Sequence, residues 1–121
     1  MSYDDNNIFA KILRGEIPCK KIYEDDFVLS FYDINPQKKV HALVIPKGQY
    51  VDLDDFSSNA SSEEMIGLLR GITAVAKKLK ISVDTGKGYR ALANISENGG
   101  QEVPHLHFHL FGGEKVGKMV E

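Results

Sequence analysis

The sequence contains no tryptophan and only one cysteine, Cys19, among its 121 residues. A single cysteine excludes an internal disulfide and a cysteine-rich zinc site, and it is consistent with a reducing compartment. Long apolar runs are also missing, because no stretch approaches the roughly 20 residues that a membrane helix needs. The first residues are acidic where a secretory signal would be basic. We therefore predict a cytoplasmic protein without a membrane partner.

A strong charge of either sign is missing too, since the net charge is -2 with 26% charged residues. This balance gives no electrostatic indication of a nucleic-acid partner. The sequence has no internal repeat and no low-complexity linker, and 42% hydrophobic residues suffice for one core in a chain of this length. We predict a single domain over residues 1–121, in which residues 114–121 form a variable C-terminal tail.

Apolar residues recur at helical spacing in two segments. The first begins after Asp5 or Asn6, which would cap the helix, and continues to Arg14. The second runs from about Ser62 to Lys80. We therefore predict two helices.

Short segments rich in β-branched and aromatic residues, bounded by turn residues, are typical of strands. Five are expected, at Ile22–Glu24, Phe27–Asp33, His41–Ile45, Tyr89–Ile95 and His105–Phe111. Most are joined by short connections, which favours an antiparallel arrangement. The predicted fold class is α+β, with a five-stranded antiparallel sheet and two helices.

Three of the four histidines alternate with apolar residues at His105, His107 and His109. Alternate side chains of a strand point the same way, so the three imidazoles would share one face and the apolar residues between them would share the buried face. Imidazole titrates near neutral pH, so one ring could attack a substrate while others donate hydrogen bonds to it. The pattern therefore indicates a catalytic surface.

Two other interpretations of the histidines remain open at this point. They could be a polar outer face, or His105 and His107 could bind zinc together with His41. The outer pair of the row, His105 and His109, would have Cα atoms roughly 13 Å apart, which is too far for one ion. A metal site would leave one histidine unused, so we favour catalysis without a metal.

The segment His105–Phe111 reads His-Leu-His-Phe-His-Leu-Phe and resembles the signature of the histidine-triad (HIT) family. Further segments resemble the Hint branch of that family in the same order along the chain: Asp4–Pro18, Phe31–Pro36, His41–Lys47, Gly88–Asn94 and Gly99–Gln101. The resemblance extends to about Gly113. It implies a HIT-like fold whose sheet is extended across a two-fold homodimer.

The resemblance also implies an activity. Hint proteins hydrolyse purine nucleoside phosphoramidates and release the nucleoside 5′-monophosphate through a covalent nucleotidyl-histidine intermediate, with no cofactor and no metal. The expected partner is a purine nucleotide of the AMP or GMP type. Two alternatives remain: a dinucleoside polyphosphate hydrolase of the same family, and a purine-nucleotide-binding regulatory protein with incidental turnover.

Family positions assign roles to the histidines of this sequence. His107 matches the nucleophile, and His109 matches the donor to the phosphate oxygens. His105 and His41 match supporting catalytic histidines. Asp33 matches the ribose-binding carboxylate, although an aspartate before Ile-Asn-Pro is also typical of a turn.

The remaining nucleotide-binding residues follow from the same match. The expected apolar walls around the base are Ile8, Phe9, Ile12, Phe31 and Ile34, and the expected residues near the phosphate are Asn94, Gly100, Gln101 and Glu102. Glu102 stands where animal Hint proteins have a serine, and the tail lacks their aromatic residue. The preferred leaving group is therefore open.

Overall fold

The computed structural model describes residues 2–120 and has the predicted α+β architecture, with five strands and four helices in that range. The helices are α1 (Ile8–Leu13), α2 (Leu53–Asn59), α3 (Ser62–Lys78) and α4 (Ser96–Gly99). The strands are β1 (Lys21–Glu24), β2 (Val28–Tyr32), β3 (Val40–Pro46), β4 (Arg90–Leu92) and β5 (Phe108–Gly112). No helix within residues 2–120 is long and apolar enough to cross a membrane.

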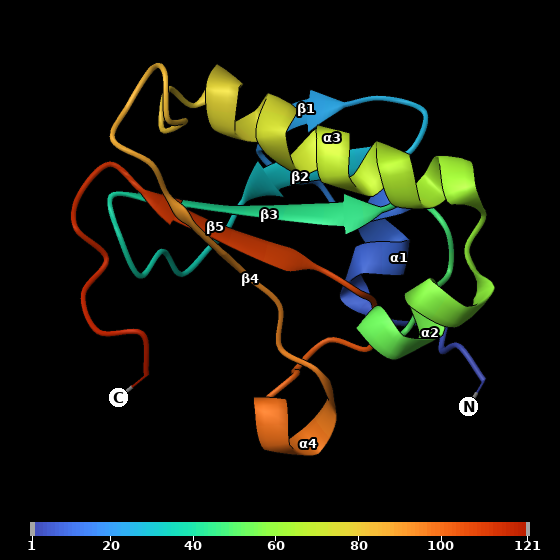
Figure 1. Ribbon diagram of the computed structural model, residues 1–121. Helices are drawn as coiled ribbons and strands as arrows, with labels where there is room; N and C mark the ends of the chain where they lie inside the picture. The colour runs from blue at the N-terminus through green and yellow to red at the C-terminus, as the bar shows by residue number, and fades with distance from the viewer. Residues whose placement is uncertain (1, 121) are drawn as a thin grey trace.

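All strand pairs are antiparallel, and the order in the sheet is β1-β2-β3-β5-β4. The last strand of the described chain, β5, therefore lies between β3 and β4 (Figure 1). In this register His109 of β5 lies opposite Leu43 of β3, and Phe111 lies opposite His41. The pairing brings His41 and His109 onto the same face of the sheet.

Helices cover both faces of the sheet, with α3 on one side and α1 on the other (Figure 1). Under α3 lie the alternate strand residues Val28, Val44 and Leu110, which pack against helix residues such as Ile72. On the other face, under α1, Phe9 packs against the strand residues that alternate with those just named: Leu29, Phe31, Leu43 and Ile45. Burial on both faces explains why β3 reads as a nearly continuous apolar run. Each fully buried aliphatic or aromatic side chain contributes roughly 1.5–3 kcal/mol.

Capping residues set where the two predicted helices begin and end. α1 begins after Asn7, whose side chain accepts a hydrogen bond from the Ala10 amide (2.9 Å), so the predicted cap at Asp5 or Asn6 was wrong by one or two residues. α3 begins with a capping box formed by Ser61 and Glu64. It ends at Lys78 rather than at Lys80, because Lys80 has a left-handed φ of 61° that an α-helix does not accommodate.

The two helices absent from the sequence prediction are short. α2 is capped by Asp52 and buries Phe56 alone, so it shows too little apolar periodicity to be recognised. α4 is a single turn whose C-cap residue, Gly100, has a left-handed φ of 75°. Both lie in segments for which the sequence predicts neither a helix nor a strand.

The histidine row is less regular than predicted, because β5 begins only at Phe108. Extending the register would place Pro46 opposite Leu106, and proline has no N–H to donate. The Leu106 amide instead donates to the carbonyl of Tyr50, which follows β3 (2.8 Å). His105 and His107 therefore precede the strand. The predicted division into one histidine face and one buried face was also wrong, since His105 is as completely buried as Leu106.

Candidate active site

The four histidines meet on the face of the sheet that α1 covers. His41 lies in β3, His109 lies in the neighbouring β5, and His105 and His107 lie in the segment that leads into β5. The ring of Phe9 from α1 contacts His107 edge-to-face, with 4.9 Å between ring centroids. His41, His105 and His107 are buried, whereas His109 is half-buried at the edge of the cluster.

The proton of His105 is placed by a backbone oxygen. Its Nε2 lies 2.8 Å from the carbonyl oxygen of Pro46, and because a carbonyl only accepts, Nε2 carries the proton. The lone pair is then on Nδ1, which accepts a hydrogen bond from the Tyr3 hydroxyl (2.6 Å). Burial lowers the pKa of His105 to about 4. His105 is therefore neutral at pH 7 and has a partner at each ring nitrogen.

The same reasoning places the proton of His107 on its other nitrogen. Nδ1 lies 2.8 Å from the carbonyl oxygen of His105 and donates to it, which leaves the lone pair on Nε2. Burial lowers the pKa of His107 below its ordinary value. The ring is thus held neutral with an unprotonated nitrogen, which is the form of imidazole that acts as a nucleophile.

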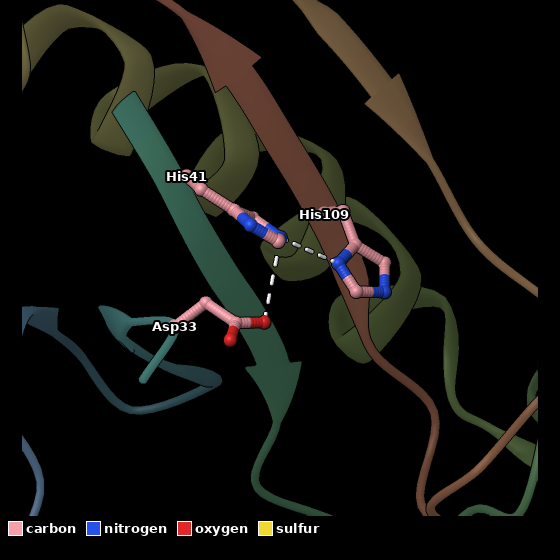
Figure 2. A group of neighbouring side chains, drawn as sticks. All are labelled: Asp33, His41 and His109. Atoms are coloured by element: carbon pink, nitrogen blue, oxygen red, sulfur yellow. Dashed lines mark hydrogen bonds and ion pairs between the residues drawn. The ribbon is translucent and has the colours of Figure 1, made fainter. Parts of the chain in front are cut away.

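His41 and His109 are joined by a hydrogen bond between their rings, drawn in Figure 2. The Gln37 backbone N–H donates to Nδ1 of His41 (3.1 Å), so His41 carries its proton on Nε2. That proton is donated to Nδ1 of His109 (2.9 Å), which leaves the proton of His109 on its Nε2. Burial lowers the pKa of both rings, that of His109 to about 4. His109 therefore offers an N–H donor, whereas His107 offers a lone pair.

Asp33 follows β2 and combines a turn with a position at the site. Its Oδ1 accepts a hydrogen bond from the Asn35 amide (2.8 Å), which is the turn role that the sequence left open. Its Oδ2 points toward Nε2 of His41 at 3.4 Å (Figure 2). One carboxylate oxygen shapes the turn, and the other remains at the histidine cluster.

Within the described residues, Asp33, His41 and His109 offer three possible metal-ligand atoms within 4.8 Å of one another. The set considered from sequence, His41 with His105 and His107, is not brought together, because Nε2 of His105 and Nδ1 of His107 bond to carbonyl oxygens. In the observed set, the Gln37 amide holds the proton of His41 on the nitrogen that a metal would need. Metal ligation requires an unprotonated nitrogen, so this hydrogen bond weighs against a metal at the cluster.

The loop that contains α4 is held by Gln101. Its side-chain amide donates to the carbonyls of Val51 (2.6 Å) and Val103 (3.0 Å), and its oxygen accepts from the Ser96 amide (3.0 Å). The Gly100 amide is likewise used within the loop, where it donates to Glu97. These two residues shape the loop beside the triad, and any contribution they make to phosphate binding would come through that shape.

Residues 14–116 match the family model of the HIT domain. The chain belongs to the HIT family. It is 53% identical to an uncharacterised HIT-like protein of Azospirillum brasilense over 98% of this chain and 95% of that protein. It is 41% identical to the purine nucleoside phosphoramidase of Escherichia coli over 96% and 94% of the two chains. Among solved structures, a HIT family hydrolase from Clostridium thermocellum superimposes with a TM-score of 0.85 at 36% identity and covers 98% of this chain and 99% of that one.

The apolar residues expected around the base divide into two groups in this HIT protein. Phe9 and Phe31 are buried and contact each other edge-to-face, with ring centroids 5.6 Å apart, so they form the floor beneath the histidines. Ile12 is half-buried beside them. Ile8 and Ile34 are exposed, by 43% and 88%, and present apolar surface outward.

Asn94 and Glu102 lie on opposite sides of the α4 loop in the sequence. Asn94 is half-buried just after β4, and Glu102 is exposed. The negative charges of Asp33 and Glu102 both oppose the lowering of the His107 pKa, although burial outweighs them. Glu102 is therefore near enough to influence the pKa of His107 while its own side chain stays exposed to solvent.

Three groups that order the histidines are not recognisable from the sequence: the Tyr3 hydroxyl, the Gln37 amide and the Pro46 carbonyl. Two of them are backbone groups, which carry no signature of residue type. Tyr3 is 102 positions from His105 and belongs to no motif of the HIT resemblance. Only the fold brings these partners to the triad.

Lowering the pH from 7.5 to 5 is expected to destabilise this HIT protein. In the unfolded chain a histidine takes up its proton near pH 6.5, whereas folded His105 stays neutral down to about pH 4. The unfolded state binds more protons between these values, so the free energy of unfolding falls as the pH falls through this window. For His105 alone the loss by pH 5 is about 2 kcal/mol.

Urea unfolding at pH 7.5 and pH 5 measures this loss. Carboxyl groups in the unfolded chain titrate mostly below pH 5 and add little in this range. A His105→Ala variant serves as the control, because its free energy of unfolding should depend less on pH by about 2 kcal/mol. Equal pH dependence in the two proteins would contradict the assignment of a neutral buried His105.

Proposed function

We propose that this chain is a hydrolase of purine nucleoside phosphoramidates that releases the nucleoside 5′-monophosphate. The observation that carries the proposal is the hydrogen bond from Nδ1 of His107 to the His105 carbonyl, which leaves Nε2 of a neutral ring as a nucleophile. The E. coli relative at 41% identity is named a purine nucleoside phosphoramidase, which supports the same substrate class.

The proposed reaction has two displacement steps. Nε2 of His107 attacks the α-phosphorus, the phosphorus–nitrogen bond breaks, and the amine leaves with the electron pair of that bond and takes up a proton from solvent. Water then attacks the phosphorus, the bond to Nε2 of His107 breaks with return of its electron pair to Nε2, and the water releases a proton to solvent as the monophosphate leaves. Splitting one displacement into two lowers each barrier. The N–H at Nε2 of His109 would donate to a phosphate oxygen as charge develops there.

In this proposal the other expected site residues contact either the base or the phosphate side of the nucleotide. The exposed Ile8 and Ile34 would contact the base above the floor formed by Phe9 and Phe31. Asn94, Gly100, Gln101 and Glu102 would lie on the phosphate side of the nucleotide, with the exposed Glu102 toward the leaving group. No step requires a metal or a cofactor, because positioning and hydrogen-bond donation suffice for phosphoryl transfer.

Adenosine phosphoramidate tests the proposal. We expect rapid release of AMP from wild-type protein, with the same rate in the presence of EDTA, because the nucleophile is a histidine rather than a metal-bound hydroxide. A diadenosine polyphosphate is the comparison substrate. Faster cleavage of the polyphosphate would favour the second enzyme class, and loss of activity in EDTA would reject the metal-free mechanism. Binding of AMP without turnover of either substrate would favour a regulatory protein.

Asp33 is proposed to distinguish ribose from deoxyribose through Oδ2. A ribonucleotide substrate should exceed its 2′-deoxy analogue in kcat/KM by about ten-fold or more, because a hydrogen bond to a carboxylate contributes roughly 1.5–3 kcal/mol. In Asp33→Ala this ratio should fall toward one. An Asp33→Asn variant keeps an acceptor for the Asn35 amide and is the matched control for the turn. An unchanged ratio in Asp33→Ala, with both substrates slowed alike, would mean that the residue serves the turn only.

Three further expectations accompany the proposed function. We propose that residues 1–121 form one HIT domain, that two chains pair about a two-fold axis with extension of the sheet, and that the protein acts in the cytoplasm. The strands at the edges of the described sheet are β1 and β4. An edge strand has unpaired N–H and C=O groups that another chain can bind.

A further inference from the structure

Tyr3 lies ahead of α1 and reaches the most deeply buried histidine of the site. Its hydroxyl oxygen is 2.6 Å from Nδ1 of His105, and the two rings meet edge-to-face with centroids 5.6 Å apart. His105 has 0% exposure, whereas Tyr3 is half-buried. The contact joins the segment before α1 to the buried histidine.

The direction of this hydrogen bond is fixed by the rest of the network. Nε2 of His105 donates to the Pro46 carbonyl, so Nδ1 has only a lone pair and the Tyr3 hydroxyl is the donor. The raised pKa of Tyr3, caused mainly by burial, keeps that hydroxyl protonated. Removing the donor would leave a buried acceptor without a partner, which costs more than the hydrogen bond itself contributed.

A second hydrogen bond connects His105 to the nucleophile. The carbonyl oxygen of His105 accepts the Nδ1 proton of His107 and so determines which nitrogen of His107 is free to attack. This carbonyl precedes β5 and lies outside the ladder that begins at Phe108, and the next amide along the chain, that of Leu106, donates to the carbonyl of Tyr50. The orientation of the carbonyl therefore depends strongly on how the His105 ring is anchored.

We infer that Tyr3 is a positioning residue for the nucleophile: its hydroxyl anchors the neutral His105 ring and thereby holds the carbonyl that keeps the lone pair of His107 on Nε2. The inference rests on the proposed function for its kinetic consequence. Tyr3 acts two hydrogen bonds away from the attacking nitrogen and touches no reacting atom. Its loss should slow the chemical step without weakening substrate binding.

Tyr3→Phe removes the hydroxyl and keeps the ring. We expect kcat for adenosine phosphoramidate to fall roughly ten-fold, which corresponds to one buried acceptor left unsatisfied, with KM unchanged within about two-fold. Tyr23→Phe is the matched control, because it removes a tyrosine hydroxyl bonded to Asp25 (2.9 Å) on the edge strand β1, away from the histidines. It should leave kcat at the wild-type value.

Long-range proton–nitrogen NMR spectra of the histidine rings provide a readout that does not depend on turnover. At pH 7.5 the wild type should show His105 protonated on Nε2 and His107 protonated on Nδ1. In Tyr3→Phe both rings should show mixed or exchanging tautomers, whereas Tyr23→Phe should match the wild type. These spectra test the inference even if the wild type hydrolyses no phosphoramidate, so the two failures are distinguishable. Unchanged tautomers in Tyr3→Phe would overturn the inference, whether or not kcat falls.

Discussion

His107→Ala is expected to lose hydrolysis of adenosine phosphoramidate by roughly 10⁴-fold or more while it still binds AMP. The substitution removes the atom that forms the covalent bond to phosphorus, so the two-step path is deleted rather than slowed. The exposed isoleucines and Asp33 are untouched, and their contacts to base and ribose would remain. The effect should therefore appear in kcat and hardly in affinity.

Release of AMP measures turnover, and calorimetric titration with AMP measures binding. Rapid acid-free quenching of wild-type protein during turnover should trap a nucleotidyl adduct, detected as added mass on a peptide that contains His107. The variant should show no such mass. Thermal unfolding checks that the buried position tolerates alanine. Turnover near the wild-type rate in a folded variant would reject His107 as the nucleophile.

The second large effect is expected at His109, where the Nε2 proton is the donor assigned to the phosphate. His109→Phe keeps an aromatic ring to stack on Phe111, which lies parallel at an interplanar angle of 2°, and it removes the donor. Loss of one pre-oriented donor to a developing negative charge costs about 10²- to 10³-fold in kcat. We expect a loss in that range.

His109→Gln is the matched variant, because a glutamine amide can place an N–H near the position of the imidazole Nε2. It should recover a substantial part of the rate that His109→Phe loses. Nε2 of His41 retains the Asp33 carboxylate at 3.4 Å as a partner in both variants, so the comparison isolates the donor to the substrate. Equal rates in the phenylalanine and glutamine variants would show that His109 acts by packing alone.

Sequence patterns predicted the sheet and the longest helix because these elements bury many side chains at regular spacing. The apolar, β-branched and aromatic composition of β2 and β3 and the helical period of α3 with its Ser61–Glu64 cap are properties of the residues themselves. α2 was not predicted because a seven-residue helix that buries only Phe56 shows no helical spacing of apolar residues. The start of β5 was misplaced because it depends on Pro46, a residue of another strand.

The site was predictable where the side chains carry the chemistry and unpredictable where backbone groups orient them. His107 and His109 stand out from sequence as paired imidazoles of one row. The carbonyls of Pro46 and His105 and the Gln37 amide decide which nitrogen is protonated, and any residue type can supply such groups. Folding alone therefore leaves a lone pair on Nε2 of His107 and an N–H on Nε2 of His109, although the four side chains are chemically identical.

Because β5 lies between β3 and β4, the sheet can be completed only after the last of its strands has been synthesised. Until the last strand is made, β3 has one open edge and β4 has no neighbour in the sheet. Such unpaired edges are the sites at which partly folded chains associate wrongly. His109 arrives on the same strand that fills the gap, and His107 directly precedes it. Closure of the sheet and assembly of the histidine cluster are thus one event. A nascent or truncated chain that lacks β5 should therefore be prone to aggregate and should show no residual turnover of the proposed substrate.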